Sequence, residues 1–72
     1  MKTKVITGKI IWQDIEMGFW GIIDKNGKEY LPMNLPAHLE KNGLEVKLEI
    51  EEMEDAMTMI MWGIPVRVVN VC

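Results

Sequence analysis

The side chains that most often carry catalysis are scarce in this chain of 72 residues, which has one histidine, His38, and one cysteine, Cys72. General acid–base catalysis needs a partner within hydrogen-bonding reach of the titrating group, and the sequence nominates none for His38. Neither a nucleophile–base pair nor a glycine-rich phosphate loop is present. The carboxylates Asp14, Glu16 and Asp24 lie where turns are expected, and a domain this small offers little room for a cleft between two of them. The sequence therefore predicts a protein that is not an enzyme and needs no cofactor.

A soft-metal site is the one chemistry that the residue types and their spacing support. Met57 and Met59 stand two residues apart in an alternating segment, so on a strand their thioethers share a face. Thioethers suit Cu(I) and Ag(I), and Ala56-Met57-Thr58-Met59 resembles the Met-Thr-Met strand of small periplasmic OB-fold proteins that carry these ions. The resemblance implies a site of Met57, Met59, His38 and Trp62. Methionine also fills irregular gaps in cores, so packing is the competing interpretation.

Apolar and polar residues alternate with a period of two along most of the chain, which predicts β-strands. The alternation is clearest over 44–51, where leucine, valine and isoleucine are interleaved with glutamate and lysine. Further strands are expected over 4–13, 18–24, 29–33, 56–62 and 65–71. One or two helical turns, of α or 3₁₀ type, are expected within 34–43. Gly8 inside the first strand indicates a bulge or a bend, and Asn26-Gly27 predicts a type I′ hairpin turn.

Three strands, a short helical connection and two or three further strands indicate an all-β fold. We expect a small five- or six-stranded OB-type barrel that spans residues 1–72 as one domain. An SH3-like barrel is the closest competitor, and the helical connection between the third and fourth strands favours the OB type. A single cysteine cannot form a disulfide within one chain. The N-terminus has no apolar signal-peptide core and no stretch long enough to span a membrane, so a cytoplasmic location is expected.

Aromatic residues in the first half are spaced as in another family. Gly8-Lys9-Ile10-Ile11-Trp12 and, after it, Gly18-Phe19-Trp20-Gly21-Ile22-Ile23 resemble the first two strands of a cold-shock domain, which read Gly-Lys-x-x-Trp and Gly-Phe-Gly-Phe-Ile at the same interval. The resemblance implies an OB-type topology with a ligand-binding face on strands one to three. The candidate residues for that face are Trp12, Phe19, Trp20, Tyr30 and Lys9.

Three features argue against the nucleic-acid ligand of that family. Met17 stands where the family has a lysine, and Gly21 where it has a second base-stacking phenylalanine. Stacking contributes about 1–3 kcal/mol per base, so the missing ring should weaken binding. The net charge is −3, whereas nucleic-acid binders usually present a basic face. We expect a non-catalytic binding or interaction module whose ligand the sequence does not identify. A protein or peptide, a weakly bound single-stranded nucleic acid, and Cu(I) or Ag(I) are the alternatives.

The second half resembles a different group of proteins. The segments Tyr30-Leu31-Pro32-Met33-Asn34-Leu35-Pro36 and Trp62-Gly63-Ile64-Pro65 resemble those of small, uncharacterised bacterial and archaeal proteins with OB-like folds. That resemblance implies the fold and no activity. Some of those relatives look like exported lipoproteins, so export stays open as the alternative to a cytoplasmic location.

Overall fold

The alternating segments form strands that wrap around one axis in the computed structural model, which describes residues 2–15, 17–53 and 62–72. The strands are β1 (Thr3–Gln13), β2 (Phe19–Asp24), β3 (Glu29–Pro32), β4 (Leu44–Glu52) and β5 (Ile64–Val71), with a 3₁₀ turn, η1 (Ala37–Leu39), between β3 and β4. No helix among the described residues is long and apolar enough to span a membrane. The strand predicted over 56–62 lies almost wholly outside the described residues.

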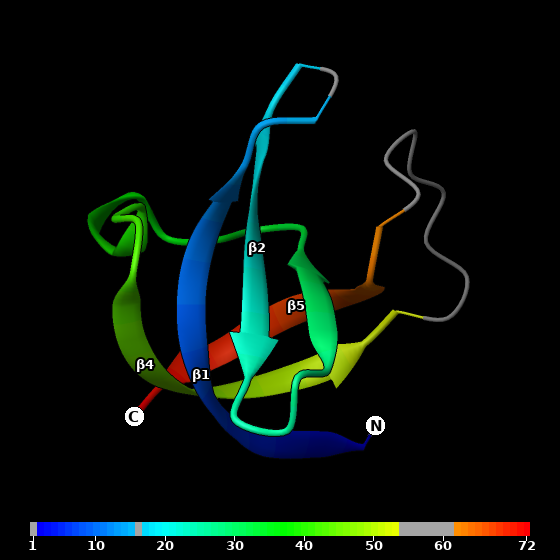
Figure 1. Cartoon of the computed structure of the whole chain (residues 1–72). Coiled ribbons are helices and arrows are strands. Elements are labelled where there is room, and N and C mark those ends of the chain that lie inside the picture. The colour runs from blue at the N-terminus through cyan, green and yellow to red at the C-terminus, as the bar shows by residue number, and fades with distance from the viewer. Residues whose placement is uncertain (1, 16, 54–61) are drawn as a thin grey trace.

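The strands close into a barrel in the order β1-β2-β3-β5-β4, with β4 pairing back onto β1 (Figure 1). The β3–β5 pair is parallel and all other pairs are antiparallel. This order confirms the predicted small all-β barrel, with a short 3₁₀ turn in the connection between the third and fourth strands. The described residues form a closed barrel of five strands, within the predicted five or six.

The barrel interior is filled by alternate residues of the strands. On β4, Val46, Leu48 and Ile50 point inward and are buried, while the glutamates and lysine between them lie on the outside. The turn η1 adds Leu39 to the same cluster. Its other members are Ile6, Ile10, Ile22, Tyr30, Val66 and Val68. A chain this short buries only about 60% of its unfolded surface, so each of these side chains carries a large share of the stability.

Of the two alternatives predicted for Gly8, a bulge or a bend, the strand register excludes the bulge. Gly8 pairs in continuous register with both Asp24 of β2 and Val46 of β4, so β1 has no bulge there. A Cβ at Gly8 would collide with the main chain of Ile23 and Asp24, so glycine is required by the close approach of β2. The register shift lies instead in the β4–β5 pair, between Glu49 and Ile50.

The hairpin between β2 and β3 is also longer than the predicted type I′ turn. Asp24 N donates to Lys28 O and Gly27 N donates to Asp24 O, both at 2.9 Å, so the loop has three residues rather than two. Asp24 Oδ1 accepts the amides of Asn26 and Lys28, each at 2.9 Å. These bonds favour the longer loop, and Gly27, with a φ of 83°, takes the left-handed position that three-residue hairpin loops need.

Candidate functional site

The five residues predicted to share a ligand-binding face are divided among three places. Lys9 and Phe19 lie on the outer side of the β1–β2 ribbon. Trp12 and Trp20 lie on the opposite, inward-facing side of β1 and β2, near the β1–β2 connection. Tyr30 is part of the core. The division follows from strand geometry, because successive side chains point to opposite faces of a sheet.

Tyr30 is the clearest correction to the predicted face. Its side chain is only 2% exposed and belongs to the core cluster. Its ring lies below two ammonium groups, with Lys4 Nζ 5.1 Å and Lys28 Nζ 5.7 Å from the ring centroid. Both ring–cation distances lie within the range of cation–π attraction. Tyr30 therefore cannot serve as a stacking platform for a base while the barrel stays closed.

Lys4 forms an ion pair with Glu52, the last residue of β4. Lys4 Nζ lies 2.9 Å from Glu52 Oε2. Hydrogen bonds to Glu52 and then to the Tyr30 hydroxyl raise the pKa of Lys4 above its usual range. The hydrogen bond from Lys4, reinforced by its charge, lowers the pKa of Glu52. The ammonium group of Lys4 therefore already interacts with Glu52 and Tyr30 within the protein.

Phe19 is covered by a residue from a distant part of the sequence. The indole of Trp62 lies against Gly21, where a Cβ would collide with its ring, and its ring centroid is 5.4 Å from that of Phe19. Phe19 is buried whereas Trp62 is partly exposed. Leu31, on the neighbouring strand, is also buried but lies outside the main core cluster. The outer side of β2 thus carries a small apolar cluster whose partly exposed aromatic ring is Trp62.

Trp12 and Trp20 form a rigid pair at the start of the β1–β2 connection. They are register partners on the two strands, and their rings meet edge to face with centroids 5.0 Å apart. Gly18, with a φ of 83°, packs against the Trp12 indole so closely that a Cβ there would overlap it. Asn42 Oδ1 accepts a hydrogen bond from Trp12 N at 2.8 Å. The exposed part of Trp12 is therefore held in a fixed position.

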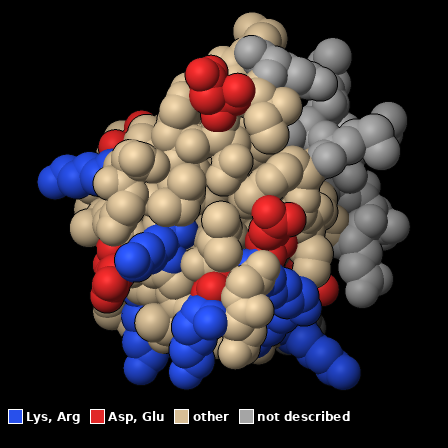
Figure 2. Space-filling model, in the orientation of Figure 1, with Lys and Arg blue, Asp and Glu red and all other residues tan. Residues whose placement is uncertain are grey.

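The β1–β2 connection continues this apolar surface. Trp12 is 43% exposed, Ile15 48% and Met17 98%, and we call these three residues the hairpin tip. Gly18 N donates to Ile15 O at 2.9 Å, which closes the turn. On the face drawn in Figure 2, the charged side chains in the upper part of the molecule, over this hairpin, are acidic, whereas lysine and arginine side chains gather lower down and at the left edge. The hairpin tip is thus an exposed apolar surface without basic residues.

Lys9 lies away from the hairpin tip, farther along the outer side of the barrel. Its Nζ is 3.9 Å from Glu45 Oε1 of β4. Both residues line a hollow of about 390 Å³ whose apolar part comes from Ile11 and Ile23. Lys9 is therefore the only one of the five predicted residues that lines this hollow.

The predicted metal ligands do not gather in the part of the chain that the structure describes. Met57 and Met59 lie outside the described residues. His38 is exposed on η1, whereas Trp62 precedes β5, and Figure 1 places η1 and the start of β5 on opposite sides of the barrel. Residues 2–15, 17–53 and 62–72 contain no group of three histidine, cysteine, aspartate or glutamate side chains that could hold a metal ion.

The sequence interpretation named Trp12 and Lys9 but missed the other residues of the hairpin tip, Ile15 and Met17, and the apolar part of the hollow. Ile15 and Met17 occupy an expected turn, where polar residues are usual, and this departure was the available signal. A second signal is that no lysine or arginine occurs between Lys9 and Lys25. The hollow has no comparable signal, because Ile11 and Ile23 come from two strands and meet only through their pairing.

Comparison of the chain with protein-family models, with curated proteins and with solved structures finds no match.

Proposed function

We propose that the chain is an OB-fold interaction module without catalytic activity, which docks its hairpin tip onto a protein partner. The observation that carries the proposal is the exposure of Met17, 98%, beside Ile15 and Trp12. Single exposed apolar residues are ordinary on protein surfaces, whereas large contiguous apolar patches mark interaction sites. Burial of one such side chain contributes about 1.5–3 kcal/mol.

The rigidity of the hairpin supports the same conclusion. Trp12 is fixed by Trp20, Gly18 and Asn42 through the contacts described above. A side chain that is already ordered loses little conformational entropy on binding, and this saving increases affinity. Tryptophan and methionine are enriched at the centres of protein interfaces.

The charges around the hairpin tip define the chemistry of the partner. Asp14 is exposed beside Ile15, and the sequence from Ile10 to Asp24 contains three acidic residues and no basic one. Complementary potentials favour association and steer it. The partner surface should therefore combine apolar side chains with lysine or arginine.

A pair of peptides tests this proposal. One is a 14-residue amphipathic peptide with leucines on one face and lysines on the other, and its counterpart has glutamates in place of the lysines. The lysine peptide should shift the Trp12 indole N–H and Met17 methyl NMR signals and bind more weakly as NaCl is raised. Met17→Ser should weaken binding roughly tenfold, since one buried side chain contributes at least about 1.4 kcal/mol. Met33→Ser, at an exposed methionine outside the hairpin tip, is the control. Equal binding of both peptides, or an unchanged affinity of Met17→Ser, would contradict the proposal.

Single-stranded nucleic acid is the second candidate ligand, and Trp62 favours it. Gly21 replaces the second stacking phenylalanine expected from the cold-shock-like spacing, and the Trp62 ring lies over Gly21 on the outer side of β2. Trp62, which precedes β5, therefore provides a partly exposed aromatic ring on the outer side of β2 at the position of Gly21. Stacking on such a ring contributes about 1–3 kcal/mol per base.

Titration with a thymidine oligonucleotide at low salt tests the second candidate. The Trp62 indole N–H signal should shift, and Trp62→Leu should weaken binding by at least roughly fivefold, whereas Trp12→Leu should not. Affinity should fall as salt is raised, because phosphate binding releases counterions. Absence of any shift at low salt would exclude this ligand and leave the protein-docking proposal intact.

A further inference from the structure

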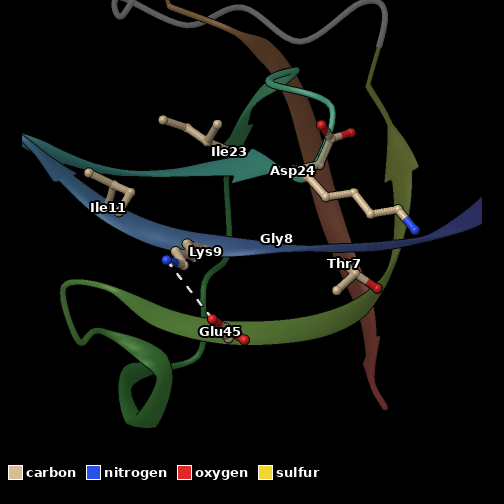
Figure 3. A pocket seen from close by; sticks show the side chains of 8 residues that line it. Thr7, Gly8, Lys9, Ile11, Ile23, Asp24 and Glu45 are labelled. Atoms are coloured by element: carbon tan, nitrogen blue, oxygen red, sulfur yellow. Dashed lines mark ion pairs between the residues drawn. The ribbon is translucent and has the colours of Figure 1, made fainter.

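The hollow on the outer side of β1 is separate from the hairpin tip and from Trp62. It lies where β1 passes between β2 and β4, around Gly8 (Figure 3). Its volume of about 390 Å³ falls within the range of roughly 300–1,000 Å³ that is usual for small-ligand sites. The hollow is therefore large enough to hold a small ligand.

The apolar part of the hollow is formed by Ile11 and Ile23. These residues point outward from neighbouring strands, are partly exposed, and are drawn side by side in Figure 3. Lys9 stands opposite Ile23 across the β1–β2 pair and opposite Glu45 across the β1–β4 pair. A ligand in the hollow would therefore meet two branched aliphatic side chains with charged groups at the rim.

Two lysines, Lys9 and Lys25, and two carboxylates, Asp24 and Glu45, lie at the rim of the hollow. Lys9 Nζ faces Glu45 Oε1 at 3.9 Å. The Asp24 carboxylate already accepts the amides of Asn26 and Lys28. Lys25 lines the hollow and, among the residues that the structure describes, forms no ion pair. Its main-chain N–H donates to Thr7 O at 3.2 Å, which holds the residue at the rim.

We infer that the hollow binds a small anionic amphiphile, with an apolar chain or ring against Ile11 and Ile23 and a carboxylate or phosphate at Lys25. Burial of an aliphatic chain contributes about 0.8 kcal/mol per methylene, which supplies the affinity. A charge-assisted hydrogen bond to an ammonium is stronger than a neutral one, and this difference selects the anion. The same chemistry is offered by a free carboxylate or phosphate ester and by the head of an anionic lipid.

Three eight-carbon probes that differ in charge separate this site from non-specific apolar binding. Octanoate added to the methyl-labelled protein should shift the Ile11 and Ile23 methyl signals with saturation. The signals of Ile10 and Ile22, which are fully buried, should stay in place as internal references. 1-Octanol should bind more weakly, and octylammonium at least roughly fivefold more weakly than octanoate, because the Lys25 ammonium attracts a carboxylate and repels a second ammonium.

Lys25→Gln should abolish the preference for octanoate over 1-octanol while leaving the fold intact, since the bond from residue 25 to Thr7 uses the main chain. Lys41→Gln, at an exposed lysine in the β3–β4 connection, should retain the preference. Sedimentation with vesicles that contain phosphatidylglycerol, in wild type but not Lys25→Gln, would identify a lipid as the source of the anion. Shifts that never saturate, equal binding of octylammonium, or an unchanged preference in Lys25→Gln would overturn the inference.

Discussion

The side-chain amide of Asn34 forms hydrogen bonds with both main-chain groups of Val68. Val68 N donates to Asn34 Oδ1 at 2.7 Å, and Asn34 Nδ2 donates to Val68 O at 3.1 Å. The parallel β3–β5 pairing ends just before, at Pro32 and Val66, and Met33 N still donates to Val66 O at 2.9 Å. The side chain of Asn34 thus takes the place of a further strand residue along the edge of β5.

Asn34→Ala should therefore lower the free energy of unfolding by about 1–3 kcal/mol, since it leaves two main-chain groups of Val68 without partners. Urea unfolding followed by circular dichroism measures the change. Asn26→Ala is a matched control, because the hydrogen bond at residue 26 comes from its main-chain N–H. An equal loss in the two variants would show that the Asn34 bonds contribute nothing specific.

The contact between Gly21 and Trp62 leads to a second prediction. Gly21→Ala places a methyl group where the Trp62 ring lies, and displacement of that ring should cost about 1–3 kcal/mol, as overpacking usually does. In a Trp62→Ala background the same substitution should cost much less. Unfolding of the four proteins of this double-mutant cycle gives the coupling energy. A cost that is the same in both backgrounds would mean that the ring moves away freely.

The fold was predictable because most of its determinants are local. The alternation over 44–51 defines both the strand β4 and its buried face, since side chains on a strand have a period of two. The short connection around η1 limits the order of the later strands. The hairpin loop was predicted one residue too short, because the hydrogen bonds of the Asp24 carboxylate were not considered beside the Asn26-Gly27 pair.

The candidate site was less predictable because neighbours in sequence can face opposite sides of a sheet. Phe19 and Trp20 are adjacent, yet Phe19 lies on the outer side under Trp62 and Trp20 packs against the core. Trp62 contacts Gly21 although the two residues are far apart in the sequence, and local sequence patterns do not predict such a contact. The exposure of Met17 depends on the path of the connection, which the sequence does not determine on its own.

Tyr30 provides a third prediction that separates a core role from a ligand-binding role. Tyr30→Ala removes a ring that is 2% exposed and should cost about 3–5 kcal/mol, a large part of the roughly 4–11 kcal/mol expected for a domain of this length. Tyr30→Phe keeps the ring and should cost much less. Thermal unfolding and the dispersion of amide NMR signals measure both. A Tyr30→Ala protein that is as stable as wild type would show that Tyr30 is not part of the core.

The Lys4–Glu52 pair gives a prediction about pH. Lys4 lowers the pKa of Glu52 in the folded protein, so the pair stabilises the fold above the pKa of an unfolded glutamate, and this contribution is lost as the pH falls through the lowered folded value. The side chains are 40% and 37% exposed, so the contribution should stay below about 1 kcal/mol.

The Glu52 carboxyl ¹³C shift, followed against pH, should give a higher pKa for Glu52 in Lys4→Met than in wild type. Addition of 0.5 M NaCl should raise the pKa of wild-type Glu52 part of the way, because salt screens exposed charges. Lys41→Met should leave the titration of Glu52 unchanged. Equal midpoints in wild type and Lys4→Met would show that the two groups are not coupled in solution.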